Sequence, residues 1–214
     1  MGRIPEEAWP PLIGGPITYD APLSLISDLD FEDEAVQLSM VLNMVRRSGL
    51  PNVRILESGP WIPDQLNSIF PFIFNSDDST FTLDRCTALC RVGDITEDLL
   101  RTYDVINLPA LSGTISENLL RMCAHYRTLL VVDLKVAQQP DGGYDRRLNR
   151  SQSSQPALFI EVCRDDDGFA VRCGGAGNPF KQLIVPSFDL NAIPLFSHEI
   201  LPTGTRILRE GYYV

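Results

Sequence analysis

The 214-residue chain lacks the features that mark membrane and secreted proteins. It has no run of about 20 apolar residues, the length that a membrane-spanning helix needs. Its first segment, MGRIPEEAWPPLIGG, is acidic and rich in proline, and it has neither the basic start nor the apolar stretch of a signal peptide. The sequence therefore predicts an intracellular protein, cytoplasmic rather than secreted, with no membrane partner.

Cysteine is sparse, with five residues scattered over the chain. Cys86 and Cys90 are the one close pair, with three residues between them. No second pair and no nearby histidine completes a zinc site. We therefore expect reduced, partly buried thiols and no metal.

Basic charge is also in short supply. The chain has 18 Lys and Arg residues against 28 Asp and Glu residues, which gives a net charge of −10. A protein that binds RNA through its phosphates usually presents a basic surface. An RNA partner therefore requires a local basic patch or a second subunit that supplies one. The densest basic cluster is Arg146, Arg147 and Arg150, which are the candidate RNA contacts.

What the chain does contain is typical of one globular domain. Its apolar fraction is 44% and its charged fraction 21%, and at roughly 150 residues per domain its length suits one large domain. Residues 1–29 are rich in Pro and Gly and are predicted to form an irregular N-terminal arm. Residues 30–214 are predicted to form the main domain, with a loop and hairpin insertion at about 137–191.

The expected secondary structure alternates between helices and strands. The predicted helices are 31–48, from Pro63 to about Phe74, a short one capped by Thr96, and one that begins at the capping box of Thr114 and Glu117. The predicted strands are 53–58, 81–84, 88–92, 103–111 and 128–136, then a hairpin of 157–164 with 169–173, and extended C-terminal segments. This alternation predicts an α/β fold with a mostly parallel sheet and helices on both faces.

Ligands of such sheets bind at the carboxyl ends of the strands, where the strand order reverses. The residues that follow each predicted strand are therefore the candidate site residues. They are Glu57, Ser58 and Gly59, then Asp84, then Gly93, Asp94 and Ile95, then Asn107, and finally Lys135.

The order of LESGPW, FTLD, VGDI, YDVINLPAL and LLVVDLK resembles the Rossmann-like S-adenosylmethionine-dependent methyltransferases. The resemblance implies S-adenosylmethionine as the cofactor. It implies that Glu57, Ser58 and Gly59 lie near the amino acid part of the cofactor and that Asp84 binds the ribose hydroxyls. It also implies that Gly93, Asp94 and Ile95 border the adenine. A carboxylate accepts two hydroxyl protons, and a glycine lets the backbone approach a ligand.

The C-terminal sequence IPLFSHEILPTGTRILREGYYV resembles the last two strands of the ribose 2′-O-methyltransferase branch, which includes ribosomal RNA enzymes and viral cap enzymes. This resemblance implies an antiparallel C-terminal strand and methyl transfer to an RNA ribose. In that branch a lysine deprotonates or orients the ribose hydroxyl, and carboxylates tune its pKa. Lys135 matches this lysine, Glu210 matches the closing glutamate, and Asn107 stands at the position of the catalytic aspartate.

The chain departs from the family pattern at several of these positions. Asn107 replaces the aspartate, and Arg46 and Arg47 stand where the first lysine is expected, although arginine does not replace a lysine base. Gly59 is followed by Pro60 and the bulky Trp61. These departures favour an alternative, a catalytically inactive methyltransferase-fold domain that acts as a structural or partner-binding subunit. A methyltransferase for a small molecule or a protein is a third reading. In the simplest reading, Asp84 and Asp94 only stabilise turns.

Overall fold

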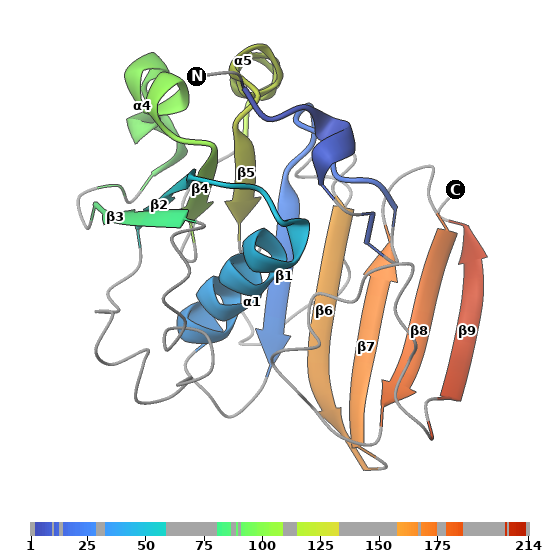
Figure 1. Cartoon of the computed structure of the whole chain (residues 1–214). Coiled ribbons are helices and arrows are strands. Elements are labelled where there is room, and N and C mark those ends of the chain that lie inside the picture. Colours follow the sequence, from blue (N-terminus) through green and yellow to red (C-terminus); the bar gives the residue numbers. More distant parts are fainter. Residues whose placement is uncertain are drawn as a thin grey trace, which may run out of the picture.

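The computed structural model describes residues 3–9, 11–12, 15–28, 33–58, 81–86, 89, 91–108, 115–132, 158–166, 168–174, 179–185, 204 and 206–212. Within these residues, nine strands form one sheet in the order β3-β2-β4-β5-β1-β6-β7-β8-β9. Figure 1 shows β3 and β9 at the two opposite edges of this sheet.

The strands are β1 Leu23–Asp28, β2 Val53–Glu57, β3 Phe81–Arg85, β4 Val105–Leu108, β5 Leu129–Val132, β6 Leu158–Asp165, β7 Gly168–Gly174, β8 Pro179–Val185 and β9 Arg206–Tyr212. The helices are α1 Asp33–Ser48, α4 Glu97–Thr102 and α5 Glu117–Tyr126, with short 3-10 turns η1 Glu6–Ala8 and η2 Val92–Asp94.

The sheet has a parallel part and an antiparallel part. Strands β3, β2, β4, β5, β1 and β6 pair in parallel with one another in this order. Strands β7, β8 and β9 continue the sheet as antiparallel neighbours. An α/β fold with a mostly parallel sheet, the predicted hairpin and the predicted antiparallel C-terminal strand are therefore confirmed.

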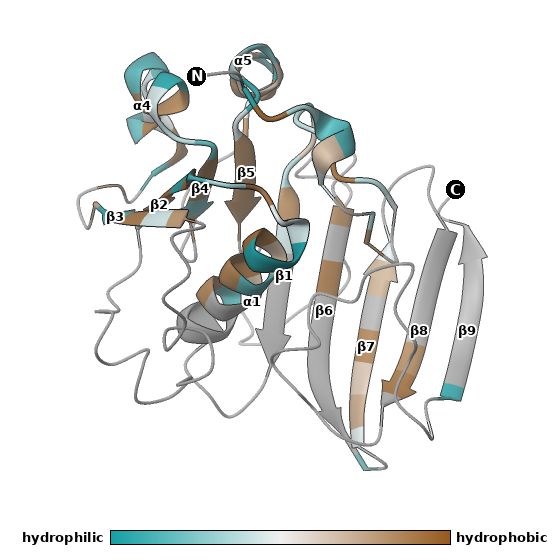
Figure 2. Ribbon diagram, viewed as in Figure 1, coloured by the Kyte–Doolittle hydropathy of each residue, from teal (hydrophilic) through white to brown (hydrophobic). Residues whose placement is uncertain are grey.

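Apolar side chains fill both faces of the parallel part, because successive residues of a strand point to opposite sides. In β4, Val105 packs in the same cluster as α1, whereas Ile106 and Leu108 pack with α4 and α5. β5 alternates in the same way between the two clusters. We call these clusters the α1 core and the α4/α5 core. Figure 2 shows the resulting apolar colour along β5. Helices thus cover both faces of the parallel strands, as the sequence predicts.

The described side chains of helix α1 between residues 37 and 45 are buried on all sides of the helix. Its side chains at Leu38 and from Met40 to Val45 are at most 6% exposed. A helix that is apolar around most of its circumference is an internal element rather than a surface one. The helix ends where Gly49 adopts a φ of +66°, a conformation that glycine accepts without steric penalty. The prediction of a helix at 31–48 is therefore confirmed over Asp33–Ser48.

The expectation of an irregular arm is wrong for residues 23–28. These residues form β1, which lies inside the sheet and pairs in parallel with β5 and β6. The strand has no local turn signal, and its pairing partners lie more than a hundred residues later in the sequence. The predicted insertion at 137–191 also needs correction. Its described residues form β6, β7 and β8, which extend the sheet rather than lie outside it.

Two local predictions are also wrong. Residues 88–92 were expected as a strand, but Val92 begins the η2 turn and Leu89 lies outside any strand. Helix α5 is capped by Ser116 rather than by Thr114, because the Ser116 side chain accepts a hydrogen bond from the backbone N–H of Leu119. The helix predicted from Pro63 to Phe74 lies outside the described residues.

Substitution of Ser116 with alanine is expected to lower the free energy of unfolding by about 1 kcal/mol, because the first turn of α5 loses its side-chain acceptor. Urea unfolding followed by circular dichroism measures this effect. Ser116→Thr is the matched control, because threonine keeps the accepting hydroxyl. Equal stability of Ser116→Ala and wild type would show that Ser116 does not cap α5.

Ser24 is a buried polar residue on the central strand β1. Its side chain is 0% exposed, and its Oγ atom has no hydrogen-bond partner among the residues that the structure describes. Ser24→Ala is therefore expected to raise the free energy of unfolding by about 1 kcal/mol, because it removes an unsatisfied buried group. Thr128→Val is the control. The buried Thr128 hydroxyl donates to the Leu100 carbonyl at 2.7 Å, so its loss should destabilise the protein. A destabilising Ser24→Ala would contradict this account.

Candidate binding site at the carboxyl ends of β2 and β4

The strand order reverses around β2. The chain passes from β2 outward to β3 and then returns to β4, on the opposite side of β2. Helices α4 and α5, which precede and follow β4, pack on one face of the sheet, and α1, which follows β1, packs on the other. Doubly wound sheets bind ligands at the carboxyl ends of the strands that flank such a reversal. We call the carboxyl ends of β2 and β4 the reversal point.

Glu57 and Asn107 lie directly opposite each other at the reversal point. They are register partners on β2 and β4, and both side chains are 0% exposed. The Asn107 Nδ2 donates to Glu57 Oε2 at 2.5 Å, and the Asn107 carbonyl accepts from the backbone N–H of Ser58 at 3.1 Å. The structure thus brings together three of the residues that the sequence predicted.

Gln37 on α1 completes this arrangement. Its side chain is 1% exposed, and its Nε2 donates to Asn107 Oδ1 at 2.7 Å. The result is a buried hydrogen-bonded chain from Gln37 through Asn107 to Glu57. Sequence reasoning missed Gln37, although a polar residue inside an apolar helical pattern was a usable signal.

A buried carboxylate is unfavourable unless hydrogen bonds replace its water. The Asn107 amide supplies such a bond to Glu57, and Gln37 fixes the orientation of that amide by bonding its oxygen. Hydrogen bonds to a charged group contribute about 1.5–3 kcal/mol each. The hydrogen-bonded chain therefore holds the Glu57 carboxyl group in a fixed position at the reversal point.

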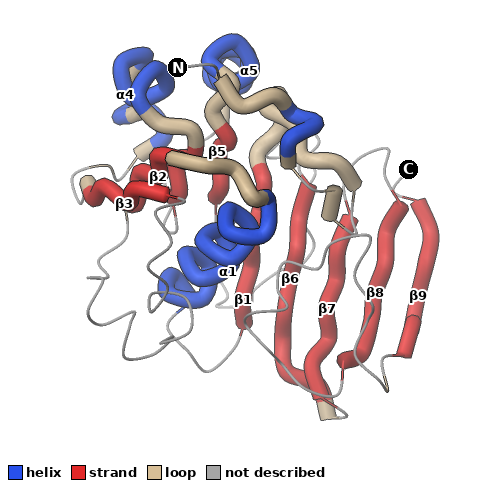
Figure 3. The backbone as a smooth tube through the Cα atoms, viewed as in Figure 1, coloured by secondary structure: helices blue, strands red, loops and turns tan. Residues whose placement is uncertain are grey.

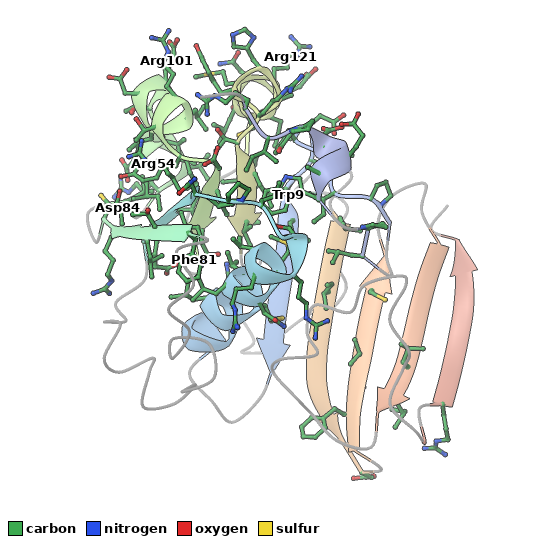
Figure 4. The ribbon with its side chains drawn as sticks, viewed as in Figure 1. Trp9, Arg54, Phe81, Asp84, Arg101 and Arg121 are labelled. Atoms are coloured by element: carbon green, nitrogen blue, oxygen red, sulfur yellow. The ribbon has the colours of Figure 1, made fainter. Side chains whose placement is uncertain are left out.

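Asp84 does not join this cluster. Its Oδ2 accepts a hydrogen bond from the Tyr103 hydroxyl at 3.0 Å and lies 3.9 Å from Arg54 Nη2. Burial, followed by this bond to Asp84, raises the pKa of Tyr103. Figure 4 shows Asp84 on the same side of β3 as Arg54. The Asp84 carboxylate, whose side chain is 44% exposed, thus belongs to a surface network on the α4/α5 side.

Gly93 and Asp94 lie in the η2 turn, and Ile95 follows it as its C-terminal cap. The Asp94 side chain accepts a hydrogen bond from the Arg91 N–H at 2.9 Å, and Ile95 is buried in the α4/α5 core. A Cβ atom at Gly93 would meet nothing within 4 Å, so the fold itself does not require glycine there. These residues adjoin no described strand end, because the predicted third strand is a turn.

The sheet order separates Glu210 from β5. Strands β1, β6, β7 and β8 lie between β5 and β9, which carries Glu210. Five strand spacings amount to roughly 24 Å. The backbone register places Glu210 opposite Lys181. The resemblance implies a glutamate near the end of β5, whereas the backbone of Glu210 lies on the edge strand β9. Gly59, Lys135 and the cluster of Arg146, Arg147 and Arg150 lie outside the described residues.

The opposite end of the sheet is covered by the N-terminal segment. Arg3 donates to the carbonyl oxygens of Leu100 and Arg101 at 3.1 and 2.7 Å, which ties this segment to the last turn of α4. Asp104 sits at the start of β4, where its Oδ2 accepts from the Arg54 N–H. Figure 3 shows the segment as loop with one helical turn, along the end at which β1 and β6 begin. The N-terminal contacts thus lie at the end opposite the reversal point.

Cys123 is buried in the α4/α5 core, and burial raises the pKa of its thiol from 9.0 to about 12. The thiol is therefore expected to resist alkylation by iodoacetamide at pH 8.5, whereas the half-buried Cys86 reacts. The pKa of the Cys123 thiol is higher in the folded protein than in the unfolded one. The contribution of this thiol to the free energy of unfolding is therefore present below about pH 9 and is lost as the pH rises toward 12. Mass spectrometry of the alkylated peptides, with urea-unfolded protein as the control, measures the difference. Equal labelling of both cysteines in folded protein would contradict it.

No group of three or more His, Cys, Asp and Glu side chains in the described residues is arranged to hold a metal ion. No helix in the same part of the chain is long and apolar enough to cross a membrane. No protein-family model matches the chain, and no curated protein matches it. A functional proposal therefore depends on the geometry of the reversal point and on the sequence motifs.

Proposed function

We propose that the chain is a methyltransferase-like domain that binds S-adenosylmethionine at the reversal point. The observation that carries this proposal is the buried Glu57 carboxylate, held by Asn107 between the carboxyl ends of β2 and β4. The sheet order β3-β2-β4-β5, with helices on both faces, is compatible with the Rossmann-like winding of that family. An ionisable side chain that is buried, fixed and placed at a strand reversal is typical of a ligand site.

Methyl transfer to the ribose of an RNA is the finer form of this proposal. It assigns Lys135 the role of orienting or deprotonating the hydroxyl, and proximity of the two reactants supplies most of the rate. An RNA partner would contact Arg146, Arg147 and Arg150 or a basic partner subunit, since the chain carries a net charge of −10. RNA affinity would then fall steeply with salt.

A specific observation favours a second candidate, a catalytically inactive domain that binds a ligand or a partner protein. Both polar atoms of the Asn107 amide take part in hydrogen bonds, to Glu57 and from Gln37. The residue at the position of the family's catalytic aspartate is thus engaged inside the core. Glu210 lies five strands from β5. The two residues that the resemblance associates with the catalytic lysine are therefore a hydrogen-bonded amide in the core and a residue on the far edge strand β9.

Isothermal titration calorimetry with S-adenosylmethionine and S-adenosylhomocysteine tests the proposal. We expect micromolar binding by the wild type and at least tenfold weaker binding by Glu57→Gln, which keeps the shape of the side chain. Glu117→Gln is the control, because Glu117 is exposed on α5 and pairs only with Arg121 among the described residues. Absence of binding by folded wild-type protein at millimolar ligand would overturn the proposal.

A methyl-transfer assay on capped RNA then separates the two candidates. Transfer that is abolished in Lys135→Ala would support the enzyme. Binding of S-adenosylmethionine without transfer would support the inactive domain.

A further inference from the structure

Strand β3 divides its side chains between the two faces of the sheet. Phe81 and Leu83 pack against the α1 core, as partly buried apolar residues. Asp84 bonds instead to Tyr103, which packs against the α4/α5 core. Figure 4 shows Phe81 and Asp84 on opposite sides of β3. Because side chains alternate along a strand, Arg85 belongs to the same face as Phe81 and Leu83.

Arg85 is the residue of β3 that neighbours the reversal point. It is the direct register partner of Glu57 in the parallel pair of β2 and β3. The backbone N–H of Cys86 donates to the Glu57 carbonyl at 2.9 Å, so the pairing continues past Arg85 to the end of the strand. The side chain of Arg85 is half-buried, and its Nε atom is buried. Arg85 therefore occupies the carboxyl edge beside Glu57, and Asp84 does not.

The chemistry of this position differs from that of a ribose-binding carboxylate. A guanidinium carries five N–H donors and binds carboxylate or phosphate oxygens in pairs. At the strand end beside Glu57, such a group is suited to pair with a ligand oxyanion. Glu57 Oε2 accepts a hydrogen bond from the neutral amide of Asn107.

We infer that Arg85, rather than Asp84, is the residue of β3 that contacts the ligand, and that the ligand carries an oxyanion at this point. This inference rests on the proposed ligand site at the reversal point. The oxyanion is the carboxylate of an amino acid moiety, as in S-adenosylmethionine, or the phosphate of a nucleotide.

Calorimetric titration of the full chain with three ligands tests the inference. S-adenosylmethionine carries the carboxylate, adenosine 5′-diphosphate carries phosphate, and 5′-methylthioadenosine carries neither. We expect Arg85→Gln to weaken binding of the oxyanion ligand on the order of ten- to a hundredfold. Binding of 5′-methylthioadenosine should be the same in Arg85→Gln and wild type. The ligand that loses affinity identifies the source of the oxyanion.

Arg54→Gln is the matched control, because Arg54 lies on the adjacent strand and contacts Asp84 and Tyr103 on the opposite face. It should leave all three affinities unchanged, and thermal unfolding confirms that both variants are folded. If S-adenosylmethionine binds the wild type and Arg85→Gln alike, the inference is overturned and the proposed function stands. If only adenosine diphosphate binds, in an Arg85-dependent way, the inference stands and S-adenosylmethionine binding fails. If none of the three binds, both are overturned.

Discussion

Replacement of Asn107 with leucine is expected to lower the free energy of unfolding by about 3 kcal/mol. Leucine fills a similar volume, but it removes the amide that donates to Glu57 Oε2 at 2.5 Å. The Glu57 carboxyl group, which is 0% exposed, would then lose that donor in a buried position. Gln37 would lose its acceptor as well. Urea unfolding at pH 7, followed by circular dichroism, measures the loss.

A second substitution separates the effect of the buried carboxyl group from that of packing. Glu57→Gln replaces this group with a neutral amide, so the double variant Glu57→Gln/Asn107→Leu should be more stable than Asn107→Leu alone. Gln37→Leu should have a smaller effect, about 1 kcal/mol, because it removes one hydrogen bond between neutral groups. A loss below 1 kcal/mol in Asn107→Leu, or a double variant that is less stable than the single one, would contradict this account of the reversal point.

Local sequence patterns predicted the elements that carry their own signals. The acidic start, helical spacing and Gly49 of α1 lie within one continuous stretch, and so does the turn that joins β6 and β7. Strand β1 has no such signal, because its backbone hydrogen bonds go to β5 and β6. Local patterns do not reveal pairing partners so far away in the sequence, and the N-terminal 29 residues were therefore expected to be irregular throughout.

Competition between two local signals explains the other errors. The apolar residues around 88–92 favour a strand, but the Asp94 side chain bonds the Arg91 N–H and closes a turn. Thr114 and Ser116 are both good caps, two residues apart, and Ser116 is the one whose side chain accepts from Leu119. Intrinsic propensity does not distinguish a strand from a turn, or one N-cap from another, in these segments, because tertiary packing decides which of the two forms.

The sequence predicted where the candidate site lies, but it did not predict all of the residues that form it. Glu57 and Asn107 follow from the rule that ligands bind at strand ends. Gln37 does not follow, because it lies 70 positions before Asn107 and on a helix. The orientation of Asp84 was open to prediction, since apolar Phe81 and Leu83 alternate with polar Thr82 and Asp84. The resemblance to methyltransferases placed a ligand residue at Asp84, whereas the alternation along β3 directs Arg85 to the Glu57 face.

Removal of the Trp9 side chain is expected to have the other large effect on stability. Trp9 is 3% exposed and packs in the α1 core together with Leu12, Ile17 and Tyr19. Its Nε1 donates to the Tyr19 hydroxyl at 2.7 Å, and that hydroxyl donates to the Ile4 carbonyl at 2.9 Å. Trp9→Ala should lower the free energy of unfolding by about 3–5 kcal/mol, because it leaves a large cavity and breaks this relay.

Trp9→Phe is the control, since phenylalanine retains much of the apolar contact and loses only the N–H donor. Its loss should be about 1 kcal/mol, the net contribution of one hydrogen bond. Burial raises the pKa of Tyr19 to about 12, so the tyrosine stays protonated and the relay stays intact through neutral pH. If Trp9→Ala unfolds like wild type, the N-terminal segment adds little to the core. If Trp9→Ala has a much lower free energy of unfolding but binds S-adenosylmethionine as tightly as the wild type at low urea concentration, the N-terminal segment supports the fold from the end of the sheet opposite the reversal point.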